Sequence, residues 1–126
     1  MAGIFTAYTA NKLKKLIQGA DAFALPTTLH IAAYTGSDGI RENNASQEAS
    51  YVGYERKVIT FDGTGVNSPV FFAGPPTEVT ITYIGILDAD ADKILWAAPL
   101  TNPAVLTPGK PLFFDSGDIV INIDTI

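Results

Sequence analysis

Several features are missing from this 126-residue chain: it has no cysteine, only one histidine, and no long apolar run. The absence of cysteine excludes a disulfide framework and any Cys-ligated zinc or iron–sulfur site. His30 has neither a second histidine for a metal pair nor a thiol for a nucleophile–base pair. A helix that spans a bilayer needs about 20 consecutive apolar residues, so we expect no membrane insertion. We expect a soluble product made in a cytoplasm.

Charged residues are few and unevenly placed. They make up 17% of the chain, against 47% hydrophobic residues, which favours a single folded domain over a disordered chain. Residues 1–19 contain three lysines and no acid, and so carry +3, whereas the remainder carries −8. Because binding to a phosphate backbone requires clustered Lys and Arg, we expect no nucleic-acid partner.

Residues 6 to 19 predict the single α-helix of the chain. Thr6 or Thr9 can cap its start, and Gly19 is a natural stop. Apolar side chains recur near helical spacing on one face and lysines on the other. Such a short helix is not stable alone in water, so it must dock on something. We expect residues 1–26 to form this helix and a linker. The expected assembly interface on it consists of Tyr8, Lys12, Leu13, Lys15, Leu16 and Ile17.

From residue 27 onward the pattern becomes that of strands. Turn signals recur about every 8 to 12 residues, which is typical of an antiparallel sandwich or barrel. We therefore expect a mainly β protein, an antiparallel, jelly-roll-like β-sandwich of seven to eight strands over residues 27–126, with one N-terminal α-helix. The expected strands are 28–35, 54–61, 66–73, 77–87, 93–100, 104–106, 111–114 and 119–124. The polar stretch 36–53 interrupts them, and a loop of that length is usually functional or mobile.

No group of residues provides a convincing catalytic or metal site. Asp88, Asp90 and Asp92 alternate like the start of a calcium loop, but Lys93 stands where a glycine is needed and Pro99 where a glutamate is needed. A solvated turn explains these aspartates better. We therefore expect no catalytic residue, no metal and no cofactor.

Three aromatic residues leave one alternative open. Tyr51, Tyr54 and Trp96 could form a stacking platform for a sugar ring, although aromatic residues in strands more often pack in the core. If they are exposed in a shallow groove, the chain is a carbohydrate-binding module that contacts a surface glycan.

The order of the motifs resembles a known family. The chain has TTLHIAAYT at 27–35, GYERKVITF at 53–61, NSPVFF at 67–72, IGILDA at 84–89, KILW at 93–96 and FDSGDIVI at 114–121. This order, behind an opening helix, is similar to that of small virion proteins of tailed bacteriophages, which are labelled tail-fibre or minor structural proteins. The resemblance covers nearly the whole chain.

The resemblance implies a non-enzymatic virion structural protein that is made in the host cytoplasm. We expect a tail-fibre or tail-associated assembly module that forms a homotrimer and contacts other virion proteins. A capsid decoration (cement) or head-fibre protein is the first alternative, because the sequence does not separate these positions on the particle. A module that binds host surface glycans is the second.

Overall fold

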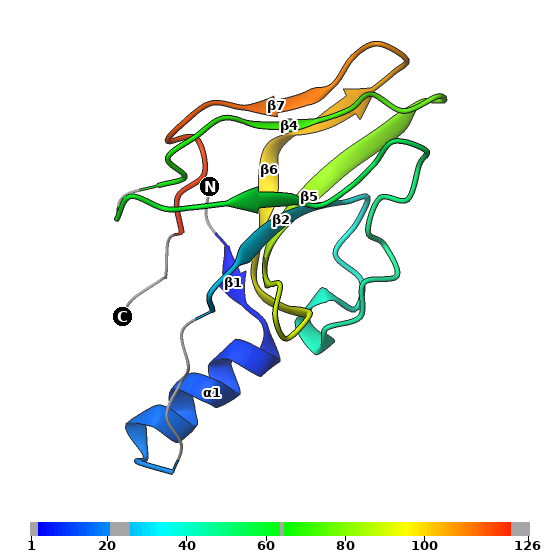
Figure 1. Ribbon diagram of the computed structural model, residues 1–126. Coiled ribbons are helices and arrows are strands. Elements are labelled where there is room, and N and C mark those ends of the chain that lie inside the picture. The colour runs from blue at the N-terminus through cyan, green and yellow to red at the C-terminus, as the bar shows by residue number, and fades with distance from the viewer. Residues whose placement is uncertain (1–2, 21–25, 64, 122–126) are drawn as a thin grey trace.

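The structure, a computed structural model, describes residues 3–20, 26–63 and 65–121 (Figure 1). It is mainly β, with 39% strand and 12% helix. The elements are β1 (Ile4–Phe5), α1 (Ala7–Ile17), β2 (Leu29–Tyr34), the 3-10 helix η1 (Ile40–Glu42), β3 (Lys57–Ile59), β4 (Val70–Phe72), β5 (Val79–Asp88), β6 (Lys93–Leu106) and β7 (Leu112–Phe114).

Two antiparallel sheets form the body of the protein. The larger has five strands in the order β1-β6-β5-β2-β3, and the smaller consists of β4 and β7. Alternating apolar residues of both sheets, such as Ile31, Phe72 and Ile81, meet in a fully buried core between them. The prediction of a sandwich-like antiparallel fold with one helix is confirmed for the described residues.

Strand β6 corrects the prediction of two separate strands at 93–100 and 104–106. Residues Lys93–Leu106 form one strand, which continues through Pro99 and Pro103. Beyond Ala97, the described residues provide no strand that pairs with β6 on the side opposite β5. Because no neighbouring strand accepts hydrogen bonds on this side of β6, the strand tolerates proline, which has no N–H to donate. The register between β5 and β6 also shifts. Ile81 pairs with Ala104 while Tyr83 pairs with Pro99, so the extra residues of β6 form a bulge between these two pairs.

The two ends of the chain differ from the predicted strands. β1 was not predicted, because two residues are too few to show a period, yet they pair with Trp96 and Ala97 of β6. The strand expected at 119–124 is not formed over 119–121, and its remaining residues lie outside the described part of the chain. Ile119 is nevertheless fully buried, and its carbonyl accepts a hydrogen bond from the Val66 N–H at 3.0 Å.

The polar stretch 36–53 is anchored at its base. The N–H of Thr35 donates to the carbonyl of Gln47 at 2.8 Å, and the N–H of Ala49 donates to the carbonyl of Ala33 at 2.9 Å. The buried side chain of Ile40, in η1, also holds the loop against the outer face of the larger sheet.

A cluster of charged and phenolic groups joins this loop to three parts of the sheet. Arg56 contacts both carboxylate oxygens of Glu48, at 2.9 and 2.8 Å, and donates to Asp92 at 2.8 Å. The hydroxyl of Tyr54 donates to Glu48 at 2.7 Å and accepts the N–H of Ala33 at 3.1 Å. Hydrogen bonding to Arg56 lowers the pKa of the Asp92 carboxyl. A bidentate Arg–carboxylate pair fixes geometry as well as charge, so this cluster orients the loop.

Two tyrosines, the buried Tyr34 and the partly buried Tyr54, provide a matched test of this cluster. The hydroxyl of Tyr34 has no hydrogen-bond partner among the described residues, whereas that of Tyr54 has two. We expect Tyr54→Phe to lower the free energy of unfolding by about 1–3 kcal/mol, because it leaves the Ala33 N–H unpaired. Tyr34→Phe should change it by less than about 1 kcal/mol or raise it, since no bond is lost. Urea unfolding at pH 7 measures both, and equal losses would contradict the assignment.

Alkaline pH should destabilise the fold through the same two tyrosines. Burial raises the pKa of the Tyr34 and Tyr54 hydroxyls above their ordinary value of 10.0. A raised native pKa gives stability that is complete below the unfolded pKa and is lost as the pH rises toward the native one. We expect the free energy of unfolding to fall above pH 10, and to fall less steeply in Tyr34→Phe. Urea unfolding between pH 8 and 11 measures the slopes (a pH window set by the tyrosine pKa of about 10), and parallel slopes would contradict the prediction.

Candidate assembly site

Two threonine hydroxyls fix the first turn of α1 to the larger sheet. Thr6 is the N-cap, and its Oγ1 accepts the N–H of Thr9 at 3.4 Å while donating to the carbonyl of Ile94 at 2.6 Å. The Oγ1 of Thr9 donates to the carbonyl of Leu95 at 2.7 Å. The predicted cap at Thr6 is confirmed, as is the stop at Gly19, which has a φ of 71°.

The far end of α1 extends beyond the sheet. Thr9, Leu13 and Leu16 lie on one face at helical spacing, but only the beginning of this face packs on β6. Figure 1 shows the helix projecting from the body of the protein. Leu16 is consequently 47% exposed and Ile17 is 85% exposed. We call the side chains of Leu13, Leu16 and Ile17 the helix tip.

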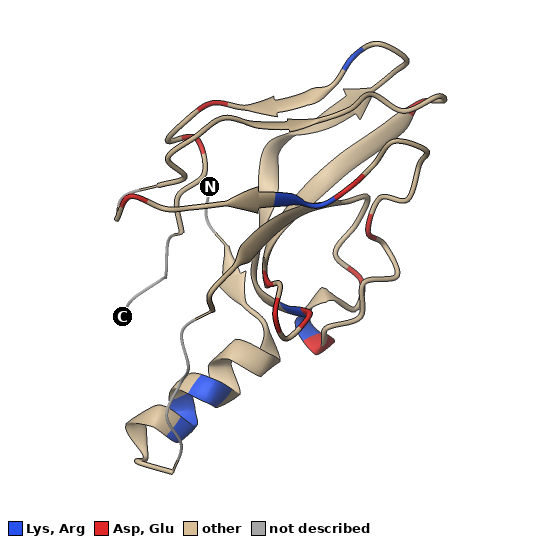
Figure 2. Ribbon diagram, in the orientation of Figure 1, with Lys and Arg blue, Asp and Glu red and all other residues tan. Residues whose placement is uncertain are grey.

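The remaining residues of the predicted interface lie on a neighbouring face of α1. The ammonium groups of Lys12 and Lys93 lie 5.7 and 5.9 Å from the centre of the Tyr8 ring. Tyr8 therefore lies on the basic face of α1, and helical spacing places Lys15 on this same face. Figure 2 shows blue on α1 and no red, so the described helix is purely basic.

An apolar hollow lies beside the base of the helix. Its volume is about 270 Å³, and Leu13 and Thr9 line it from the helix side. Phe5, Leu95 and Phe61 are among the residues that line it from the body, and Thr9 provides the one polar side chain among its described lining residues. This hollow extends the apolar surface of the helix tip toward the core.

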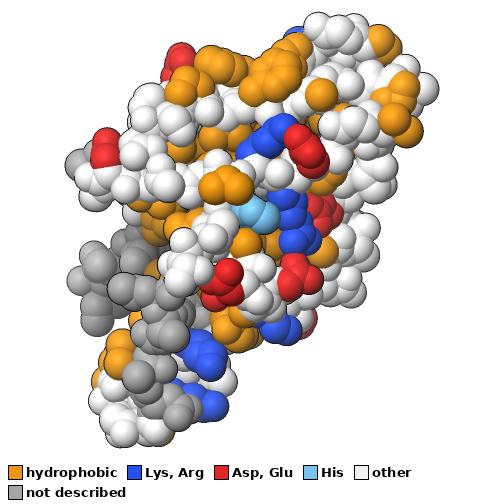
Figure 3. All heavy atoms as spheres, viewed as in Figure 1, with side chains coloured by type: hydrophobic (Ala, Val, Ile, Leu, Met, Phe, Trp, Pro, Cys, Tyr) orange, Lys and Arg blue, Asp and Glu red, His pale blue; other side chains and the backbone are white. Residues whose placement is uncertain are grey.

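A second apolar surface lies at the opposite end of the molecule, on the outer side of β4 and β7. Phe71 and Phe113 are directly paired across the two strands and are 51% and 52% exposed. Their neighbours along each strand point into the core. Figure 3 shows apolar side chains gathered over these strands at the top of the view. This pair is not among the predicted site residues, although the two similar triplets VFF at 70–72 and LFF at 112–114 carry the signal.

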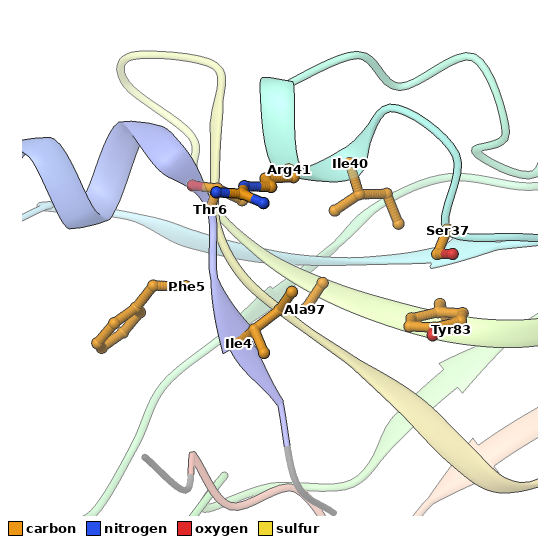
Figure 4. Close-up of a pocket in the computed structure, with 8 residues that line it drawn as sticks. All are labelled: Ile4, Phe5, Thr6, Ser37, Ile40, Arg41, Tyr83 and Ala97. Carbon is orange, nitrogen blue, oxygen red and sulfur yellow. The ribbon is translucent and has the colours of Figure 1, made fainter. Parts of the chain in front are cut away.

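A small cavity on the outer face of the larger sheet offers little chemistry. It measures about 160 Å³ and lies between β1, β6, β5 and η1. Figure 4 shows Ile4, Ala97, Ile40 and Tyr83 turned toward it, with Phe5 pointing away. Arg41 is the one charged residue among its described lining residues. The cavity therefore lacks a pair of groups for acid–base or nucleophilic catalysis.

The fold and these surfaces agree with a comparison against known protein families. Residues 4–122 match a family described as podophage GP4 fiber I protein gp80. The chain belongs to this fibre family. A comparison with curated proteins found no match.

Membership in this family confirms the resemblance to phage virion structural proteins. The fibre protein is a structural component of a bacteriophage particle, where it contacts other virion components. Within the described residues, no helix is long and apolar enough to cross a bilayer.

The three aromatic residues proposed for glycan contact do not form one open surface in this fibre protein. Trp96 is buried in the core. Tyr51 and Tyr54 pack edge to face with their ring centres 5.6 Å apart, and Tyr54 stacks on Phe72. Both hydroxyls bond protein groups, that of Tyr51 donating to the carbonyl of Ala73 at 2.6 Å. Glycan contact at these residues stays a prediction.

The acidic turn of the fibre protein is held by protein donors. The carboxylate of Asp88 accepts the N–H groups of Asp90 and Ala91, at 2.9 and 3.2 Å. Asp90 accepts from the N–H and hydroxyl of Thr27, and Asp92 accepts from Arg56. The hydrogen bond from the Thr27 hydroxyl lowers the pKa of the Asp90 carboxyl. These contacts explain the three aspartates as a hydrogen-bonded turn.

Removal of the Thr6 hydroxyl should loosen the helix from the sheet. Thr6→Val keeps the shape of this buried side chain but removes the cap and the bond to Ile94, so we expect a loss of about 1–2 kcal/mol in the free energy of unfolding. Thr6→Ser keeps the hydroxyl and serves as the control. Urea unfolding and amide hydrogen exchange in α1 provide the measurement. Equal losses in the two variants would show that the methyl group, rather than the hydroxyl, carries the effect.

Proposed function

We propose that this fibre-family protein is a non-enzymatic assembly module that forms homotrimers on the phage tail, with the helix tip of one copy docked on a neighbouring copy. The observation that carries the proposal is the exposure of Leu16 and Ile17 at the end of a helix that is otherwise fixed to its own sheet. The helix is held in place but its apolar face is only partly covered, which is the arrangement expected of an element that has a second contact to make.

The energetics favour burial of the helix tip in an assembly. Covering a Leu or Ile side chain completely contributes about 1.5–3 kcal/mol. Because the Thr6 and Thr9 bonds already orient the helix, little conformational entropy is lost when it docks. The basic segment and the acidic body of each copy also attract each other between copies at moderate ionic strength.

The position on the particle separates the proposal from its first alternative. A tail module and a capsid decoration or head-fibre protein can share this fold and differ in the protein to which they attach. The family description, which names a fibre, supports the fibre assignment. Antibody labelling of intact particles in the electron microscope tests it, and label on the capsid surface would favour the alternative.

The mass of the purified protein tests oligomer formation. We expect size exclusion with light scattering to give about three times 13.4 kDa. The double variant Leu16→Ser/Ile17→Ser should shift the protein toward monomer, because it removes the apolar contact of the helix tip. Val52→Ser is the matched control, since Val52 is 84% exposed but belongs to the 36–53 loop and not to α1. A monomeric wild-type protein, or an unchanged mass in the double variant, would refute docking through the helix tip.

A further inference from the structure

The outer face of β4 and β7 has a chemistry that suits the helix tip. Phe71 and Phe113 form its exposed centre, and Pro69, which directly precedes β4, is also exposed. Large exposed aromatic residues in adjacent positions are uncommon on a monomer and are characteristic of contact surfaces. We call Pro69, Phe71 and Phe113 the aromatic face.

Carboxylates border this face at one end. Asp115 follows Phe113 by two residues and is exposed. Asp118 lies in the same turn, where its Oδ2 accepts the N–H of Asp115 at 2.8 Å. Figure 2 shows red on the chain that follows β7 and blue on α1, at opposite ends of the protein.

The helix tip has the complementary chemistry. Its apolar side chains Leu16 and Ile17 are flanked by Lys14, which is exposed, on a segment with no acid. An apolar centre with a positive border can therefore meet an apolar centre with a negative border. Complementarity of this kind selects the partner and its orientation.

We propose that the aromatic face of a second copy of this chain is the surface that receives the helix tip. Leu16 and Ile17 of one copy contact Phe71 and Phe113 of the next, and Lys14 lies toward Asp115 and Asp118. This inference rests on the proposed docking of the helix tip and adds the surface on which it docks.

The placement of the two surfaces determines the type of assembly. Because they lie at opposite ends of the protein, the contact joins different surfaces of the two copies (Figure 1). A contact of this type closes into a ring when the rotation between copies permits and otherwise continues as a filament. A closed ring of three is the form that agrees with the proposed homotrimer.

Charge reversal provides the first test. We expect Lys14→Glu and Asp115→Lys each to weaken self-association by at least about tenfold, because each puts like charges together, and the combination of both in one chain to restore it. Glu78→Lys makes the same charge change on an exposed residue outside the aromatic face, and should have no effect. Sedimentation equilibrium measures the dissociation constant. Failure of the combined variant to recover would overturn the pairing.

A mixing experiment provides the second test. Phe113→Ser removes the receiving surface and Leu16→Ser/Ile17→Ser removes the helix tip, so each variant alone should be monomeric. Mixed in equal amounts, they retain one intact helix tip and one intact aromatic face, and should form a dimer of about twice 13.4 kDa that does not grow further. Circular dichroism confirms that both variants are folded.

The outcomes separate the two proposals. If the helix-tip variant loses association while Phe113→Ser and Asp115→Lys keep it, the helix docks elsewhere, and the inference fails while the proposed function stands. If the helix-tip variant keeps its association, the proposed function itself fails.

Discussion

The anchoring of α1 on the carbonyls of Ile94 and Leu95 is the interaction on which the rest of the assembly surface depends. β1 pairs with β6 only as far as Phe5, and a buried carbonyl left without a donor is costly. The hydroxyls of Thr6 and Thr9 donate to these two carbonyls where the strand turns into the helix, beside the Thr6 N–H on Leu95 and the Asn43 amide on Ile94. The same two side chains thereby complete the sheet edge, cap the helix and fix the direction in which the helix leaves the body. An 11-residue helix without such an anchor would not keep its shape.

The two apolar surfaces follow from this arrangement and from the size of the sheets. The larger sheet is too short to cover all of α1, so the last turn lies beyond it. The smaller sheet has only two strands, and its inner face is used completely by the core. Its outer face therefore keeps Phe71 and Phe113 in solvent. Both surfaces are therefore open to solvent, as the proposed contact between copies requires.

Local chemistry made much of the fold predictable. A threonine cap, a glycine stop and the polar–apolar alternation over residues 79–83 of β5 each have one strongly preferred structure. The predictions failed where tertiary contacts outweigh local preference. The sequence predicts separate strands at 93–100 and 104–106, but the free edge of β6 accepts Pro99 and Pro103 and the strand continues through both. The alternation of Ile119 and Ile121 predicts a strand. Ile119 is instead buried in an irregular segment, where its carbonyl accepts a hydrogen bond from the Val66 N–H. The position of Tyr8 beside Lys93 joins residues far apart in sequence, so no helical periodicity could indicate it.

The prolines of β6 have a further consequence for any contact between copies of this protein. The stretch of β6 beyond Ala97 has β5 as its one strand partner among the described residues, and such an edge could add a strand from another copy. Pro99 and Pro103 remove N–H donors from this stretch, and the bulge between them distorts its hydrogen-bonding pattern. Backbone pairing between copies is thereby disfavoured, so the proposed docking would rest on side chains, whose shape and charge can distinguish a correct neighbour from an incorrect one.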